Sequence, residues 1–187
     1  MTQLRAQQLT RANKLARAVW QVVYWLVFRL TPVPLHAWRA GVLRLFGASI
    51  GKRVRIYPSA KIWAPWNLVM ADESCIGPDV DCYCVDCINL GVGAVVSQRS
   101  FLCTASHDYN SAAHTLMTAP ILIMSHTWVT AEVYIGPGVV LNEGSVALAR
   151  SVVIRSVDAW CVVGGNPAHF IKYRKPCHKL INSPPHE

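Results

Sequence analysis

Residues 123–153 read IMSHTWVTAEVYIGPGVVLNEGSVALARSVV and repeat with a period of six. In rows of six, every row opens on an aliphatic residue or alanine and carries a small or β-branched residue at its fifth position. An α-helix needs apolar recurrence near 3.6 residues and an ordinary strand needs a period of two, so neither explains this pattern. The repeat predicts short strands joined by sharp corners, with each aliphatic side chain pointing into a narrow prism.

The same repeat runs outward from this segment to Ile50 and to Gly164. It slips by two residues between Ile62 and Met70 and again between Cys82 and Leu90, which predicts longer corners at both places. The expected inward positions are Ile50, Ile56, Ile62, Met70, Ile76, Cys82, Leu90, Val96, Leu102, Ile123, Val129, Ile135, Leu141, Ala147, Val153 and Ala159.

Glycine directly follows several inward positions, at Gly51, Gly77, Gly91 and Gly136. We expect these glycines to supply the permissive backbone that sharp corners need. Because each coil would stack only on its neighbours, the expected fold class is an all-β parallel solenoid with a cap at each end.

The length of 187 residues suits one such domain with short flanking segments. We expect an N-terminal helical, basic and apolar segment over 1–48, the solenoid domain over 49–165 and a C-terminal tail over 166–187. Residues 108–122 interrupt the repeat and predict a loop ejected from the coil, directly after Ser106-His107. Long loops on a rigid solenoid are usually functional.

The N-terminal segment is basic, because no acidic residue precedes Asp72 in a chain of net charge +8. Its apolar run, Ala18 to Leu30, has helical spacing but is shorter than the ~20 residues of a membrane-spanning helix. Two interpretations stay open. The helix caps the open end of the solenoid, or it lies on the anionic inner face of the cytoplasmic membrane as a peripheral anchor.

The seven cysteines are an odd number, and no secretory leader is visible, so we expect free thiols and a cytoplasmic location. Cys82, Cys84 and Cys87 cluster, but the fourth ligand and paired spacing of a zinc site are missing. The sequence therefore predicts no metal.

Four stretches together resemble a known family: FLCTASHDY at 101–109, API at 119–121, VVGGNPAHFIK at 162–172 and TPVPLHAWRAGVLRLFGASIG at 31–51. They are similar to the hexapeptide-repeat acyltransferases, especially the branch of maltose, galactoside and colanic-acid-type exopolysaccharide acetyltransferases. The resemblance implies a left-handed parallel β-helix and a homotrimer. It also implies that acetyl-CoA lies in a groove between neighbouring subunits.

Position by position, the resemblance places His107 on the catalytic histidine, where imidazole takes a proton from a sugar hydroxyl attacking the thioester carbon. Asp108 is a candidate for catalytic support, although adjacent residues on an extended chain usually point to opposite sides. Tyr83 is a candidate for the acceptor pocket, since this branch often has an Asp-Asn pair where this chain has Tyr83-Cys84. The positions matching the acetyl-CoA groove are Trp128, Ala131, Ala149, Ile154, and, facing the CoA phosphates, Arg155 and Lys172.

The sequence therefore predicts an O-acetyltransferase that moves acetyl from acetyl-CoA to a sugar hydroxyl of an exopolysaccharide or other surface glycan. The acceptor is a glycan that is free, nucleotide-linked or lipid-linked. One alternative is a trimeric binding scaffold without catalysis. Another is a zinc enzyme like the γ-carbonic anhydrases, using His107, His114 and His126, although these lack that family's close histidine pair. A nucleic-acid partner is not expected, because the basic residues alternate with an apolar stretch rather than forming a stacking platform.

Overall fold

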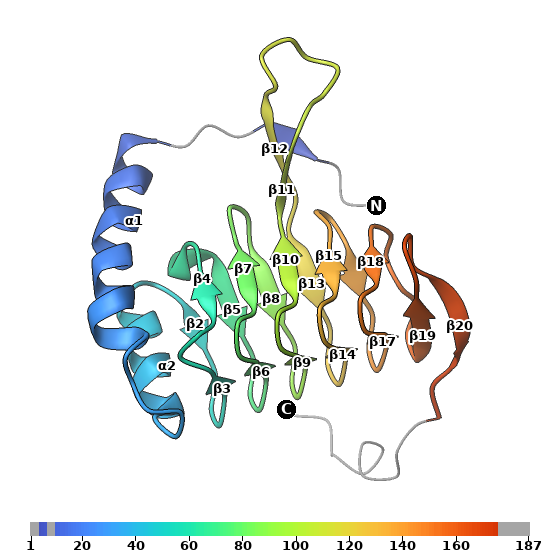
Figure 1. Cartoon of the computed structure of the whole chain (residues 1–187), viewed down its shortest axis with the longest axis horizontal. Helices are drawn as coiled ribbons and strands as arrows, with labels where there is room; N and C mark the ends of the chain where they lie inside the picture. The colour runs from blue at the N-terminus through green and yellow to red at the C-terminus, as the bar shows by residue number, and fades with distance from the viewer. Residues whose placement is uncertain (1–3, 7–9, 176–187) are drawn as a thin grey trace, which may run out of the picture.

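The computed structural model describes residues 4–6 and 10–175, and it is a parallel β-solenoid with helices across one end (Figure 1). Three sheets run along the solenoid. Sheet 1 contains β4 (Lys61–Ile62), β7 (Asp81–Tyr83), β10 (Phe101–Cys103), β15 (Tyr134–Ile135) and β18 (Val152–Val153). Sheet 2 contains β2 (Ser49–Ile50), β5 (Leu68–Met70), β8 (Ile88–Leu90), β13 (Ile121–Ile123) and β16 (Val140–Leu141).

Sheet 3 contains β3 (Arg55–Ile56), β6 (Cys75–Ile76), β9 (Val95–Val96), β14 (Trp128–Val129), β17 (Val146–Ala147), β19 (Cys161–Gly164) and β20 (His169–Tyr173). The chain visits sheets 2, 3 and 1 in turn, and each strand pairs in parallel with its equivalent one coil later, as Ile76 does with Val96. Strand β20 is the exception, because it turns back antiparallel along β19 and so pairs the last edge of sheet 3.

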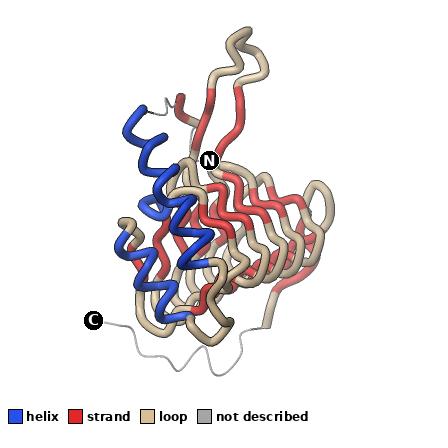
Figure 2. The backbone as a smooth tube through the Cα atoms, turned by 60° about the vertical axis from the view of Figure 1, so that its left-hand side comes forward, coloured by secondary structure: helices blue, strands red, loops and turns tan. Residues whose placement is uncertain are grey.

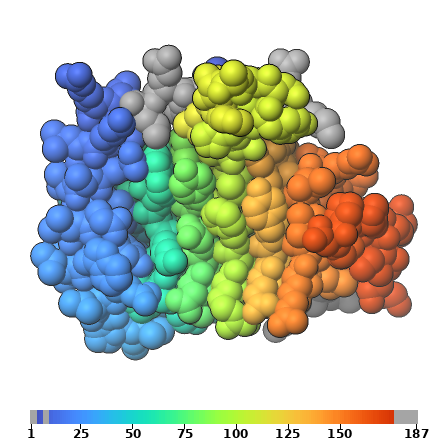
Figure 3. Space-filling view, turned by 45° about the horizontal axis from the view of Figure 1, so that its top comes forward, coloured from blue at the N-terminus to red at the C-terminus, as the bar shows by residue number. Residues whose placement is uncertain are grey.

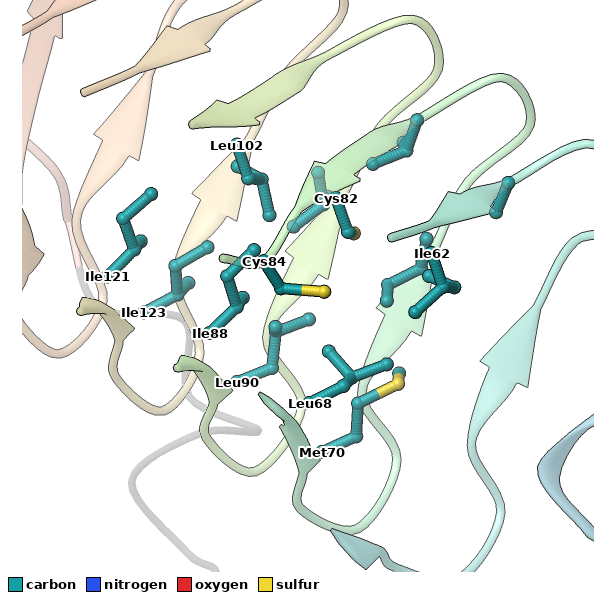
Figure 4. Packing of buried hydrophobic residues seen from close by; sticks show 14 of the residues in the cluster. Ile62, Leu68, Met70, Cys82, Cys84, Ile88, Leu90, Leu102, Ile121 and Ile123 are labelled. Atoms are coloured by element: carbon teal, nitrogen blue, oxygen red, sulfur yellow. The ribbon is translucent and has the colours of Figure 1, made fainter. Parts of the chain in front are cut away.

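The inward side chains form stacked layers that fill the prism (Figure 4). Every expected inward position from Ile50 to Val153 is buried. The thiols of Cys82 and Cys84 point into the same apolar core, and burial raises the pKa of Cys84 to about 12. The six described cysteines are all free.

The series of expected inward positions was wrong at its last member, Ala159. Ala159 is exposed, whereas Val157 is buried and forms an isolated parallel bridge with Leu141 of sheet 2. The side of the coil between Val153 and Val157 is therefore shorter than a full hexad. Valine offers more apolar volume than alanine to fill the prism, and Val163 still stacks on Ala147.

The expected reason for the corner glycines was also wrong. A left-handed φ falls on the third residue after many of the inward positions, and that residue is usually not glycine, as at Arg53 (53°), Glu73 (61°) and Arg99 (58°). At Gly51 and Gly91, glycine is needed for a different reason. A Cβ at Gly91 would lie 2.5 Å from the backbone nitrogen of Ser125 in the next coil.

The left-handed residues stack from coil to coil and carry opposite charges. Arg53 bonds Glu73 on one corner, and on another Glu132 accepts from both Arg99 (2.6 Å) and Arg150 (2.7 Å). These guanidinium groups lower the pKa of Glu132. Such exposed pairs add little stability individually, but they align neighbouring corners.

The N-terminal helices close the open end of the solenoid (Figure 2). Helix α1 (Arg11–Val23) is capped at its N-terminus by Thr10, whose hydroxyl accepts the Asn13 N–H. The helix continues into a π-helical turn, η1 (Tyr24–Phe28). Trp20, Tyr24 and Phe28 are buried, and the Trp20 indole donates to the Ile62 carbonyl at 2.6 Å. Trp25, by contrast, is 55% exposed, so the aromatic residues of this helix divide between two faces.

Helix α2 (His36–Leu45) is joined to this cap through Arg39, which is fully buried. Its guanidinium donates to the Ile56 carbonyl (2.6 Å), to the Thr31 hydroxyl (2.7 Å) and to the carbonyls of Pro32 and Val33. A buried cation is tolerated only when its donors are satisfied, as they are here. No helix among the described residues is long and apolar enough to cross a membrane.

We predict that Gly91→Ala lowers the free energy of unfolding by about 2 kcal/mol, because the new methyl group meets backbone that cannot move aside. Gly41→Ala is the matched control. Gly41 lies in α2 with nothing within 4 Å of a new Cβ, so alanine there should raise stability by about 0.5–1 kcal/mol. Urea denaturation at equal protein concentration measures both, and equal stabilities for the two variants would refute the close-approach argument.

Candidate active site

The repeat breaks after β10, where the chain leaves the coil as a hairpin of two antiparallel strands, β11 (Ala105–His107) and β12 (Leu116–Thr118). The hairpin projects from the corner between sheets 1 and 2 and stands out over the middle coils (Figure 3). The short strand β1 (Arg5–Ala6) pairs with the other edge of β12. The segment expected as a loop over 108–122 is thus an ordered projection whose chain rejoins the coil at β13.

Thr104 fixes the base of the hairpin and was not identified from the sequence. Its buried hydroxyl donates to the Tyr83 carbonyl (2.8 Å) and accepts the Asp86 N–H (2.9 Å). Its carbonyl accepts the Ala119 N–H from the returning chain at 3.0 Å. Thr104 therefore joins both strands of the hairpin to the preceding coil.

His107 lies at the end of β11, exposed to solvent in the single chain. Its Nδ1 is 2.6 Å from the carbonyl oxygen of His114 across the hairpin. A carbonyl oxygen only accepts, so Nδ1 carries the hydrogen, and the neutral ring then presents a free lone pair at Nε2. His114 takes a left-handed φ of 44°, which is uncommon for a residue with a side chain and directs its carbonyl at the ring. The backbone thus selects the tautomer in which Nε2 can act as a base.

Asp108 holds the tip of the hairpin. Its Oδ1 accepts the Asn110 N–H at 2.9 Å, and its own N–H donates to the Thr115 carbonyl at 2.9 Å. This is the local turn that aspartate favours. The described contacts of the carboxylate are therefore with the turn that positions His107 and His114.

Tyr83 belongs to a column of aromatic rings on the outer surface of sheet 1. Its ring contacts Trp63 (centroids 5.5 Å apart) and Phe101 (6.3 Å), and Phe101 contacts Tyr134 (5.7 Å). Burial and the neighbouring Cys103 thiol raise the pKa of Tyr134 to about 12, so its hydroxyl stays protonated at neutral pH. The column passes the coil that carries the hairpin, since Phe101 begins β10 and the hairpin follows Cys103 at the end of that strand.

A hollow of about 350 Å³ lies beside this column, between the helical cap and sheet 1. It combines aromatic surfaces with charged groups, the mixture that a polar ligand with apolar faces needs. Burial raises the pKa of Asp81 within it, while the nearby Lys61 ammonium opposes that shift. The residues lining the hollow are Gln21, Tyr24, Trp25, Arg29, Lys61, Ile62, Trp63, Asp81 and Tyr83.

The candidate acetyl-CoA residues fall on two edges of the prism. Trp128 starts β14 in sheet 3, and Ala131 and Ala149 occupy equivalent corner positions that follow sheet 3 in successive coils. Lys172 lies on β20 at the end of the same sheet, opposite Val162. Ile154 and Arg155, by contrast, follow β18 at the corner between sheets 1 and 2, the edge that carries the hairpin.

A second hollow, of about 400 Å³, lies around Trp128, whose indole donates to the Ser97 hydroxyl at 2.9 Å. Arg174 also lines it and was not identified from the sequence. Its guanidinium donates to the carbonyls of His126 (2.9 Å) and Gly144 (3.0 Å), which fixes a positive charge beside the indole. Among the described residues, no group of three or more His, Cys, Asp or Glu side chains is arranged to hold a metal.

Comparisons with known proteins place this geometry in context. No family model matches the chain. A putative colanic acid biosynthesis acetyltransferase of Escherichia coli K12 is 43% identical over 162 residues, which cover 87% of this chain and 89% of the relative. Two solved structures share the fold at a TM-score of 0.80, and both alignments cover 89% of this chain.

The first is a maltose O-acetyltransferase of Clostridium difficile, 21% identical over 90% of its chain. The second is a hexapeptide-repeat acetyltransferase of Vibrio cholerae in complex with acetyl coenzyme A, 22% identical over 91% of its chain. The chain belongs to the hexapeptide-repeat acetyltransferase family. The expected left-handed β-helix and acetyltransferase class of this protein are confirmed.

In this acetyltransferase, we predict that Asp108→Asn keeps turnover within about threefold, because an amide oxygen accepts the Asn110 N–H equally well. Asp108→Ala removes that acceptor, loosens the turn that positions the His107 ring, and should lower turnover by about tenfold or more. Steady-state rates of the two variants separate the alternatives. If Asp108→Asn falls as far as Asp108→Ala, the negative charge itself is required and Asp108 acts on the chemistry.

Proposed function

We propose that this acetyltransferase moves acetyl from acetyl-CoA to a sugar hydroxyl of an exopolysaccharide or other surface glycan, with His107 as general base. The observation that carries the proposal is the hydrogen bond between His107 Nδ1 and the His114 carbonyl. It leaves Nε2 free on an exposed ring at the end of β11 in the antiparallel hairpin. The acetyl-CoA complex of the Vibrio cholerae neighbour and the colanic acid pathway named for the relative support the donor and the acceptor class.

The chemistry needs one group that takes a proton and returns it. Nε2 takes the proton of the sugar hydroxyl as that oxygen forms its bond to the thioester carbon. The His114 carbonyl accepts from Nδ1–H throughout and favours the imidazolium that forms. When the carbon–sulfur bond breaks, Nε2–H returns the proton to the thiolate, which leaves the sugar acetyl ester and free CoA. No acyl-cysteine is required, and the nearby Cys103 thiol donates to the Ala105 carbonyl instead.

The acceptor pocket is proposed along the aromatic column that includes Tyr83. Aromatic rings offer flat apolar surfaces on which the C–H faces of a pyranose can pack, while the hydroxyls of the sugar bond to charged groups at the rim. The adjoining hollow contains Lys61, Asp81 and Arg29 for such bonds. The hollow lies between the cap and sheet 1 and adjoins the aromatic column. Together they offer a surface long enough for a glycan of more than one sugar unit.

The donor site is proposed between neighbouring subunits of a homotrimer. One chain carries Trp128, Ala131, Ala149 and Lys172 on one edge and Ile154 with Arg155 on another. A groove between two copies joins an edge of one chain to a different edge of the next, which brings both sets to one ligand. Arg155 and Lys172 then supply cations for the CoA phosphates.

We predict that His107→Ala lowers kcat by about a hundredfold or more, the usual effect of removing a general base. His114→Asn is the matched control in the same hairpin. It keeps the carbonyl that orients His107, and asparagine tolerates the left-handed φ, so turnover should stay within about threefold. Acetyl-CoA consumption with a glycan acceptor measures both variants.

Near-normal turnover in His107→Ala would remove His107 from the mechanism. Acetyl-CoA binding by the wild type without turnover on any glycan would instead favour a binding scaffold. Circular dichroism of both variants checks that the β-helix is intact. This control excludes unfolding as the cause of a lower rate.

We predict a particle mass three times that of the 20.7 kDa chain in light scattering at micromolar concentration. A stable, fully active monomer would contradict the shared site.

We also predict that Trp128→Ala weakens acetyl-CoA binding by about tenfold, because it removes an exposed ring from the proposed groove. Titration calorimetry with acetyl-CoA measures this loss of affinity independently of the acceptor.

A further inference from the structure

Among the described residues, the helical cap has a second face of exposed apolar side chains. Leu15, Val19, Val22, Leu26 and Leu30 recur at helical spacing and are each between 51% and 73% exposed. Leu15, Val19 and Val22 share one side of α1, and the buried Trp20 and Tyr24 occupy the opposite side. Leu26 follows in η1, and Leu30 lies in the turn directly after it. We call the five exposed residues the outer stripe.

The outer stripe is part of a larger apolar surface at this end of the molecule. Trp25 and Trp38 are 55% and 53% exposed, and Leu45 at the end of α2 is 86% exposed. More than half of the large apolar side chains exposed on the described chain lie between residues 4 and 45. Exposed apolar side chains gathered at one end of a protein usually mark an interaction site.

The charge on the cap identifies the occupant. No acidic residue occurs in the chain before Asp72, whereas Arg11 and Lys14 are exposed on α1, with Arg11 one turn before Leu15. The other arginines of the cap have partners within the protein. Arg17 packs on the Trp63 ring at 4.1 Å, and Arg39 is buried. Arg29 pairs with Asp79 at 4.0 Å, and Arg44 donates to the Ile50 and Gly51 carbonyls. Two copies joined through this face would bring like charges together, so self-association is disfavoured and an anionic surface is favoured.

We propose that the outer stripe docks this protein on an anionic phospholipid bilayer. The apolar side chains enter the boundary between headgroups and acyl chains, Arg11 and Lys14 meet lipid phosphates, and Trp25 and Trp38 lie at headgroup level. The helix is too short to span the bilayer, so attachment is peripheral and reversible. Trp20 and Phe28 take no part, because they form the inner face of the cap.

Docking also sets the height of the active site. The helices lie across the end of the solenoid (Figure 2). Trp20, Tyr24 and Phe28 on the inner face are buried, whereas the outer stripe is exposed. The hairpin leaves the coil two coils after β4. One helix diameter and two strand spacings place His107 at a height of roughly 20 Å above the headgroups. The hollow beside Tyr83 lies between the helical cap and the coil that carries the hairpin.

This height suits an acceptor glycan that is attached to a membrane lipid, and that step rests on the proposed function. The docking itself does not, since it concerns a surface remote from the hairpin. A failure of the docking proposal would therefore appear as a loss of vesicle binding with normal turnover on a soluble acceptor. A failure of the proposed function would appear as a lack of that turnover with normal vesicle binding.

Vesicle co-sedimentation of the full-length protein tests the docking. We expect binding to vesicles containing phosphatidylglycerol, little binding to pure phosphatidylcholine vesicles, and release as salt rises from about 0.1 to about 0.5 M. A triple variant, Leu15→Gln with Val22→Gln and Leu26→Gln, should lower the bound fraction about tenfold or more. Its turnover with a soluble acceptor should equal that of the wild type.

A matched control variant changes exposed apolar residues at the opposite end of the solenoid, Phe170→Gln with Tyr173→Gln, and should bind vesicles like the wild type. Arg11→Gln with Lys14→Gln should reduce binding to anionic vesicles while leaving the outer stripe intact. Should the triple variant fold poorly, quenching of tryptophan fluorescence by brominated lipid gives a second measurement. That quenching should decrease in Trp25→Phe.

Three results would overturn the proposal. The intact protein could remain in the supernatant with anionic vesicles at low salt. The triple variant could bind as well as the wild type. A drop in particle mass in the triple variant, without vesicle binding in the wild type, would assign the outer stripe to another copy of the chain.

Discussion

The register between successive coils is the constraint on which the rest of this structure depends. Each inward side chain stacks on its equivalent one coil later, as Ile56, Ile76 and Val96 do, and the same alignment closes the backbone hydrogen bonds between coils. A close approach such as Gly91 against Ser125 exists because the register leaves no room for a side chain. The ion pairs of Glu132 align because left-handed residues recur at the same corner. A residue gained or lost within a strand would disturb all of these together, and the differences in length between coils fall at the corners between sheets 1 and 2.

The hairpin that carries His107 uses the one large interruption of this register among the described residues. Thr104 leaves the coil while remaining bonded to Tyr83, Asp86 and Ala119, so the projection starts from a fixed base. His107 ends β11 and His114 lies in the turn before β12, so a backbone carbonyl of the turn meets an imidazole nitrogen of the strand. The proposed base is therefore oriented by main chain rather than by a second titratable side chain. This arrangement keeps its geometry over a wide pH range, because a carbonyl does not change its protonation state.

The helical cap solves the problem that a solenoid has at its first coil, where an apolar prism would otherwise face water. Trp20, Tyr24 and Phe28 cover the open end, and the buried Arg39 joins the helices, their connector and the Ile56 carbonyl. A helix used only as a cap needs one apolar side. This one has two, and the second combines leucine, valine and tryptophan with exposed arginine and lysine. The proposed attachment to a bilayer follows from that second face and from its charge.

The sequence by itself determined the solenoid, because a six-residue repeat with inward aliphatic residues permits few other structures, and local composition is enough to read it. It also located the interruption at His107 and the family of the chain, through motifs that are contiguous. It misjudged Ala159 and the reason for the corner glycines, since both depend on which backbone lies in the next coil. Only the tertiary structure decided the roles of Thr104, the His114 carbonyl and Arg174, whose partners are distant in sequence or are main-chain atoms. The two faces of the cap were equally hidden, because an apolar helix shows which side is buried only once it is packed against the coil that covers it.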